Sequence, residues 1–322
     1  EAVQNDPDTS ELHFALGNLF RRRGEYERAV RVHEHLLSRG DLSRTDRERA
    51  QHALALDFLK AGLLDRAEQA LQRLENTPFE AEARMALLAI YERSSDWPQA
   101  AAIADKMDRA AQGDFSIRQA HYLCEQAAAQ VAAGQTDEAC LLLEKAITTA
   151  PAAARARIEL AALQQTAGDQ AAAFQTLRQI ADAAPAAMPL AAARLAQTAT
   201  ASGQVDTALA LLDHSYDNAP SLDVLEAMVT LQEGSQGVQA REAYVRHLER
   251  EPSLVAAAKW LAGERLEHEQ FHPQVQRALD HAVKPLTRYR CAACGFEAKQ
   301  HFWQCPGCQT WDSYPARRVE EL

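Results

Sequence analysis

The chain has 322 residues, of which 47% are hydrophobic and only 6% aromatic, and its net charge is −11. Because alanine and leucine supply most of the apolar content, the composition favours helices over sheets. The acidic balance argues against a free-standing nucleic-acid-binding protein, which would carry a basic surface. No stretch is long and apolar enough to span a membrane: the most apolar run, residues 183–193, is short and contains two prolines.

A short motif with glycine at its first position and alanine at its sixth recurs along the chain. Successive copies in the middle of the chain are 34 or 35 residues apart, and a proline follows each of these glycines by 17 residues. Internal similarity at such a period is typical of repeat proteins. The copies are Gly24–Ala29, Gly62–Ala67, Gly134–Ala139, Gly168–Ala173 and Gly203–Ala208, with a weaker one at Ser95–Ala100 and a degenerate one near residues 235–240.

Each repeat is predicted to be a pair of helices. Apolar residues at helical spacing, such as Leu12, Leu16 and Leu19, precede the first glycine. The glycine allows the left-handed backbone that ends the first helix, and the alanine allows the second helix to approach the first closely. One hairpin cannot bury its apolar face alone, so successive hairpins are expected to stack.

The segment from Leu16 to Ala29 resembles the tetratricopeptide repeat, with Gly17, Phe20 and Gly24 at positions of that pattern. The resemblance implies an all-α superhelix of about six units and a degenerate seventh, which we assign to residues 1–252. Residues 253–284 keep a helical pattern and are predicted to form the last hairpin or a cap. Stacked tetratricopeptide units form a concave groove that binds peptides or proteins, and very few of them are enzymes.

Groove residues follow from the repeat pattern, because the second, fifth and ninth positions of each first helix usually line the concave face. A basic run at the end of the first helix could also meet an acidic partner. The alternatives are a solvated helix face for the arginines and ordinary packed positions for His121 and Cys124. The predicted partner-binding residues are Phe14, Asn18, Arg21, Arg22, His52, His121 and Cys124.

Four of the six cysteines lie near the end of the chain as two C-x-x-C pairs separated by ten residues. Two tight turns at this spacing can bring four thiolates around one ion, so Cys291, Cys294, Cys305 and Cys308 are predicted metal ligands. The pattern indicates a reducing compartment rather than a disulfide framework. The Lys284-Pro285 pair marks a boundary, and residues 285–322 are predicted to form the metal-binding module.

The two cysteine turns resemble those of rubredoxins and zinc ribbons, and a short β-hairpin is expected between them. Four cysteines suit zinc and iron equally well as ligands, but the short loops favour zinc, with iron as the alternative. Gln309 stands where the second turn often has glycine, which weakens the case for a dedicated electron-transfer centre. His301 lies between the pairs and is a further possible ligand, although four cysteines already complete the shell.

Neither catalysis nor nucleic-acid binding is supported by the residues. No nucleophile–base pair, paired carboxylates or glycine-rich phosphate loop stands out, so the chain is predicted not to be an enzyme. Residues 285–322 contain five basic and four acidic side chains, a balance too weak for binding phosphate backbones. The function classes still open are protein binding and, if the four cysteines hold iron, electron transfer.

Residues 16–37, 120–125 and 288–311 resemble the lipopolysaccharide assembly protein B family of Gram-negative bacteria, and the resemblance spans the chain. It implies a non-enzymatic adaptor on the cytoplasmic side of the inner membrane. The family promotes degradation of the lipid A pathway deacetylase by a membrane AAA+ protease, and a second inner-membrane protein regulates it. A rubredoxin-like iron redox protein and a generic scaffold for envelope biosynthesis enzymes are the alternatives.

Family members are held in the membrane by one N-terminal transmembrane helix. The present sequence begins at Glu1 without that helix, as expected for a piece of a longer protein that is soluble by itself.

Overall fold

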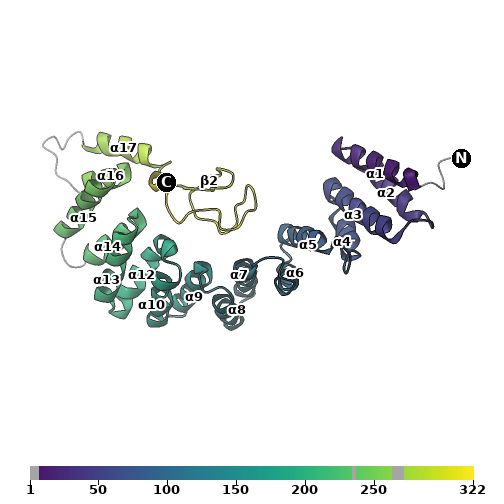
Figure 1. Cartoon of the computed structure of the whole chain (residues 1–322). Helices are drawn as coiled ribbons and strands as arrows, with labels where there is room; N and C mark the ends of the chain where they lie inside the picture. The colour runs from purple at the N-terminus through teal and green to yellow at the C-terminus, as the bar shows by residue number, and fades with distance from the viewer. Residues whose placement is uncertain (1–6, 234–236, 263–271) are drawn as a thin grey trace. The chain divides into compact units, whose positions relative to one another are not determined.

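The computed structural model describes residues 7–233, 237–262 and 272–322. The described residues are mostly helical, with two short strands near the C-terminus (Figure 1). This confirms the predicted all-α tetratricopeptide-repeat class with a small cysteine-containing module. The chain divides into two compact units, Glu1–Phe115 and Ser116–Leu322, each with its own packed helices.

The first unit consists of helices that pack in sequence order, α1 against α2, α2 against α3 and α3 against α4, with α5 against α6. This order of contacts is typical of stacked helical hairpins. The helices are α1 (Pro7–Arg22), α2 (Tyr26–Ser38), α3 (Arg44–Ala61), α4 (Leu64–Gln72), α5 (Glu80–Ser94) and α6 (Trp97–Arg109).

The second unit continues the pattern with α7 (Ser116–Ala132), α8 (Thr136–Thr149), α9 (Ala154–Thr166), α10 (Gln170–Arg178), α11 (Ile180–Ala183), a 3₁₀ turn η1 (Pro185–Ala187), α12 (Met188–Ser202), α13 (Val205–Asn218), α14 (Leu222–Glu233), α15 (Gly237–Arg250), α16 (Leu254–Ala262) and α17 (His272–Val283). Within this unit the helices follow one another along a curve, and the C-terminal module lies on its inner side (Figure 1).

The motif glycines end the first helix of each repeat, as predicted. Gly62 and Gly203 adopt left-handed backbone conformations, with φ of 74° and 71°, directly after α3 and α12. In the weaker copy Ser95 takes the same conformation with φ of 58°, which costs a residue with a Cβ atom about 1 kcal/mol. The turn geometry is therefore kept even where the glycine is absent.

The motif alanines mark the closest approach of the two helices in a hairpin. The six alanines in the well-described copies are completely buried: Ala29, Ala67, Ala100, Ala139, Ala173 and Ala208. The degenerate copy near residues 235–240 falls partly outside the described residues. A larger side chain at these positions would push the helices apart, since protein interiors are close-packed. The predicted role of these alanines is confirmed.

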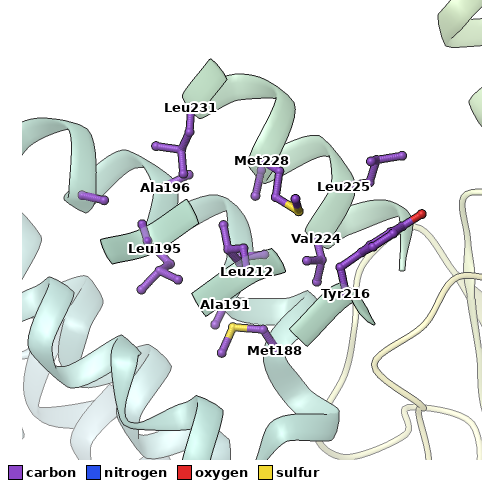
Figure 2. Packing of buried hydrophobic residues seen from close by; sticks show 14 of the residues in the cluster. Met188, Ala191, Leu195, Ala196, Leu212, Tyr216, Val224, Leu225, Met228 and Leu231 are labelled. Atoms are coloured by element: carbon purple, nitrogen blue, oxygen red, sulfur yellow. The ribbon is translucent and has the colours of Figure 1, made fainter. Parts of the chain in front are cut away.

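The largest hydrophobic cluster of the second unit forms where α12, α13 and α14 meet (Figure 2). Met188 and Leu195 of α12, Leu212 of α13 and Val224 of α14 are completely buried there. Trp303 of the C-terminal module packs against the edge of the same cluster. The hydrophobic core of the repeats therefore extends to the module.

A charged group lies in the interior of the first unit. Asp57 of α3 is completely buried, and its two carboxylate oxygens contact Arg21 of α1 at 2.7 Å and His33 of α2 at 2.5 Å. Both partners are needed, because a buried carboxylate without partners is strongly destabilising. The His33 ring in turn lies directly against Gly17, so that α1 and α2 touch at a point where only glycine fits.

The C-terminal module contains β1 (Tyr289–Arg290) and β2 (Glu297–Ala298), which pair antiparallel with Tyr289 opposite Ala298. A 3₁₀ turn, η3 (Val319–Glu321), follows close to the end of the chain. The hairpin was expected between the two cysteine turns, but β1 precedes Cys291 and β2 follows Cys294, so the observed hairpin encloses the first turn instead. The boundaries at residues 252 and 285 remain predictions, since the division into compact units falls elsewhere.

In the part of the chain that the structure describes, no helix is both long enough and apolar enough to cross a membrane.

Gly17→Ala should destabilise the first unit, because the added methyl group would overlap the His33 ring, which Asp57 holds in place. We expect a loss of about 1–3 kcal/mol in local stability, the usual cost of overpacking. Hydrogen exchange of α1 and α2, followed by mass spectrometry, measures it. Gly40→Ala is the matched control, since its methyl group would meet nothing within 4 Å. Equal exchange in the two variants would contradict the argument.

Candidate metal centre

The four cysteines of the two C-x-x-C pairs come together in the structure. Their sulfur atoms all lie within 4.8 Å of one another. The Sγ atoms of Cys291 and Cys308 are 3.8 Å apart, and those of Cys294 and Cys305 are 3.7 Å apart. Four sulfurs at about 2.3 Å from a tetrahedral zinc ion would be separated by roughly 3.8 Å. These four residues could therefore hold one metal ion.

The two cysteine turns share one backbone arrangement. In the first, the Gly295 amide donates to the Cys291 carbonyl, and in the second the Gln309 amide donates to the Cys305 carbonyl. Gly295 and Gln309 both have left-handed backbones, with φ of 78° and 61°. Gln309 thus occupies a glycine-type position in the second turn, where its side chain adds strain that glycine would avoid.

Hydroxyl groups surround the sulfurs. The Oγ of Ser313 lies 3.2 Å from the Cys291 sulfur, and the Oγ1 of Thr310 lies 3.3 Å from the Cys308 sulfur. The Gly307 amide also donates to the Cys305 sulfur, at 3.4 Å. Donors in these places stabilise negative charge on sulfur, which is the form that binds metals.

The cysteine pKa values differ according to these surroundings. Desolvation opposes ionisation of Cys291, but hydrogen bonds from Ser313 and the backbone outweigh it and lower the pKa to about 6. A hydrogen bond to the Phe296 backbone favours the Cys294 thiolate, but desolvation and the neighbouring sulfurs raise its pKa to about 12. Neighbouring thiolates repel one another, and a bound cation would balance their charge.

His301 is not a member of the sulfur cluster. Its Nε2 donates to the Tyr314 carbonyl at 3.0 Å, and its ring meets Trp303 edge-on with centroids 4.7 Å apart. Burial lowers the pKa of His301, which favours the neutral ring. His301 therefore packs the module, as do Tyr289, Tyr314 and the half-buried Phe302, whereas Phe296 is 45% exposed.

The module contacts the repeats first through α7. The indole of Trp311 stacks on the His121 ring, with centroids 4.7 Å apart and planes inclined by 17°. Nε2 of His121 lies 2.8 Å from the Asp312 carboxylate, and Tyr122 meets the indole edge-on. His121 was predicted to line an open groove, but it is 1% exposed and lies under the module.

A second contact joins the module to α14. Arg318 forms a two-pronged ion pair with Asp223, with nitrogen–oxygen distances of 2.9 and 2.8 Å. Its guanidinium also lies 4.2 Å above the Tyr289 ring. Paired hydrogen bonds of this kind fix orientation as well as adding attraction.

The last acidic residues of the chain cap two helices. A Glu321 carboxylate oxygen accepts a hydrogen bond from the Leu222 amide at the start of α14. Glu320 accepts hydrogen bonds from the amides of Leu254 and Val255 at the start of α16. Carboxylates are favourable at helix N-termini, where amides lack partners within the helix. No local sequence signal reveals these contacts, because cap and helix are 65 to 99 residues apart.

The predicted groove residues of the first unit differ in accessibility. Phe14 is 1% exposed, with the Arg49 guanidinium above its ring, so a partner does not reach it in this structure. Arg21 is bound to Asp57, whereas Arg22 is exposed.

The remaining predicted groove positions also include both accessible and buried side chains. His52 stacks on Phe79 and lies 3.2 Å from Glu82; burial lowers its pKa. Asn18 is partly exposed and accepts a hydrogen bond from Arg21. Cys124 is 1% exposed, and burial raises its pKa, which makes it unreactive. The groove assignment stays a prediction for the accessible positions.

The fold and the site together define a class: tetratricopeptide-repeat proteins with a C-terminal rubredoxin-type module. Residues 12–48 match the tetratricopeptide repeat family, and residues 289–314 match the rubredoxin metal binding domain. Over its whole length, the chain is similar to lipopolysaccharide assembly protein B of Escherichia coli (strain K12), with 28% identity over 330 residues, covering 100% of this chain and 85% of the relative.

The protein of the same name from Haemophilus influenzae is 27% identical over 327 residues, covering 94% of this chain and 78% of the relative. The expected resemblance to this family is thereby confirmed. The C-terminal part of a TPR repeat-containing protein from Cytophaga hutchinsonii is a similar solved structure, with 12% identity, coverage of 79% and 100% of the two chains, and a TM-score of 0.41. That likeness does not bear on function.

Thr310→Val should weaken metal binding while keeping the shape of the side chain. It removes the hydroxyl next to the Cys308 sulfur, which is the first cause of the lowered pKa of Cys308. We expect about tenfold lower affinity, the low end of the effect of such outer partners. Competition with a coloured chelator measures it. Thr310→Ser, which keeps the hydroxyl, should bind like the native chain; equally tight binding by the valine variant would refute the role.

His121→Ala should loosen the module from α7, since it removes both the stack with Trp311 and the hydrogen bond to Asp312. A loss of about 1–2 kcal/mol is expected, which corresponds to roughly 5- to 30-fold faster local opening. Hydrogen exchange over residues 301–314 reports on it. His214→Ala, an exposed histidine of α13, is the control and should leave these residues unchanged. Unchanged exchange in both variants would contradict the docking role.

Proposed function

We propose that the chain is a non-enzymatic adaptor that regulates lipopolysaccharide synthesis at the cytoplasmic face of the inner membrane. On this proposal it brings the lipid A pathway deacetylase to the membrane AAA+ protease, and a further inner-membrane protein regulates it. The observation that carries the proposal is the similarity to lipopolysaccharide assembly protein B over the whole chain. A stacked-hairpin fold, which offers a surface for protein partners, supports the same reading.

In this proposal the four cysteines hold one metal ion, zinc rather than iron, and residues 285–322 form the metal-binding domain. The sulfur–sulfur distances of 3.7 and 3.8 Å suit a tetrahedral ion. The ion has a structural role, because a module this small has too little apolar surface to hold itself together. Iron in the purified chain, with reversible reduction, would favour the redox alternative instead.

Partner binding is proposed for the first unit. In the second unit the module covers α7 at His121, so this part of the inner face is used within the chain. In the first unit, Asn18, Arg22 and His52 keep accessible surface on the first helices of the repeats. An adaptor that holds one protein here and another elsewhere raises their effective concentration for each other, which accelerates proteolysis without any catalytic group.

Cys291→Ser should abolish the adaptor activity, because three remaining sulfurs hold the ion poorly and the module then loses its fold. The test measures the half-life of the deacetylase by pulse-chase in Gram-negative cells that carry the full-length protein, with circular dichroism to check that the helices persist. We expect a half-life close to that of cells without the adaptor.

Cys140→Ser is the matched control, since Cys140 is a half-buried cysteine of α8 outside the sulfur cluster. It should leave the deacetylase half-life at its normal value. Normal degradation with the Cys291 variant would contradict the adaptor mechanism, and failure of the normal protein to co-purify with protease and deacetylase would leave only a general scaffold for envelope enzymes.

A further inference from the structure

A cavity of about 480 Å³ lies in the second unit between the repeats and the C-terminal module. Its volume falls in the range of small-molecule sites, roughly 300–1,000 Å³. Five basic side chains from separate parts of the chain line it: Lys259 of α16, Lys284 after α17, Arg288 before β1, Lys299 after β2, and Arg318 near the C-terminus. This concentration of positive charge is unusual in a chain whose net charge is −11.

Two acidic residues also line the cavity, and each is already paired. Asp223 accepts both hydrogen bonds of the ion pair with Arg318, at 2.9 and 2.8 Å. Glu226 forms an ion pair with Lys259. These pairs neutralise two of the five cations, and neither acidic residue of the lining pairs with the other three.

The remaining three basic side chains have few acidic neighbours. Arg288 is 3.7 Å from Glu297, a carboxylate that Arg290 already holds at 2.8 Å. Among the residues that the structure describes, neither Lys284 nor Lys299 forms an ion pair with an acidic side chain. Within the described ranges, two ammonium groups without an acidic partner and one weakly paired guanidinium therefore face one cavity.

The walls of the cavity are held by backbone hydrogen bonds. The Val319 amide donates to the Arg288 carbonyl at 2.7 Å, and the Glu320 amide donates to the Leu286 carbonyl at 3.2 Å. The Arg318 guanidinium also donates to the Thr287 carbonyl at 2.9 Å. The cations are thus presented from a fixed frame, which lowers the entropic cost of binding.

We infer that this cavity binds a small ligand that carries two phosphate groups, either as a soluble molecule or as the headgroup of a lipid. A single carboxylate has two oxygens and one charge, and one guanidinium satisfies it. Two lysines without an acidic partner among the described residues and one arginine that shares its carboxylate instead suit the several oxygens and the multiple charges of a diphosphate. The inference is independent of the adaptor function proposed above.

The test is calorimetric titration of the whole chain with inorganic pyrophosphate at low salt. We expect saturable binding to the native chain. The double variant Lys284→Glu/Lys299→Glu should bind at least about tenfold more weakly, since hydrogen bonds to charged groups are each worth about a factor of ten or more. Both lysines are exposed, so the variant should fold, and circular dichroism checks this.

Lys145→Glu is the control for charge alone, because Lys145 is an exposed lysine of α8 that does not line the cavity. It should bind pyrophosphate like the native chain. Absence of binding at millimolar pyrophosphate, or equal weakening by the control and the double variant, would overturn the inference.

Two further binding measurements test the source of the phosphate groups and the chemical class of the ligand. Vesicles of phosphatidylcholine with diacylglycerol pyrophosphate, compared with phosphatidylcholine alone, show whether a lipid diphosphate is bound. Binding that the double variant loses indicates a lipid headgroup, and pyrophosphate binding without vesicle binding indicates a soluble ligand. A polyglutamate peptide that binds more tightly than pyrophosphate, and that the double variant no longer binds, would overturn the phosphate class in favour of an acidic protein segment.

Discussion

Mutual repulsion among four sulfur atoms within 4.8 Å of one another is the constraint on which the C-terminal module depends. A bound cation would balance the charge of their thiolates and, by holding all four, would fix the segment that contacts the repeats. Thr310, Ser313 and Tyr314 of this segment contact the cysteine sulfurs, whereas Trp311 and Asp312 between them contact α7. The same stretch of backbone therefore contributes to the metal centre and to the docking surface. A structural change at the metal centre is thus expected to alter the contacts with α7.

The module connects helices that are far apart in the sequence. Stacked hairpins ordinarily contact only their neighbours, so their stability is close to a sum of local terms. Here the residues next to Cys308 reach α7, while Arg318 reaches α14 and Glu320 reaches α16. These contacts link distant repeats of the second unit to the C-terminal module. Repeats linked in this way are expected to unfold together with the module and not one at a time.

The fold was predictable because its signals are local, whereas most of the docking contacts are not. Glycine, alanine and cysteine spacings each act over a few residues, and the structure follows them even at Ser95, which takes the glycine conformation. His121 and Asp312 are 191 residues apart, and no pattern pairs them. The position rule for groove residues identifies a helix face and not what covers that face, and on that face Phe14 is 1% exposed. Asp57, a lone acid among apolar residues, was the one visible sign of a buried ion pair.

The basic cavity bears on the same connection between repeats and module. Lys259 belongs to α16 and Lys284 directly follows α17, whereas Arg288, Lys299 and Arg318 belong to the module. A ligand in this space touches both sides, so it binds the docked arrangement better than a separated one and stabilises it by an amount that grows with its concentration. By the same linkage, a metal ion that holds the module in shape increases the affinity of the cavity for its ligand, and the ligand increases retention of the metal. A metal cation would then balance the charge of the cysteine thiolates, an anionic ligand would balance the charge of the basic cavity, and each would favour binding of the other.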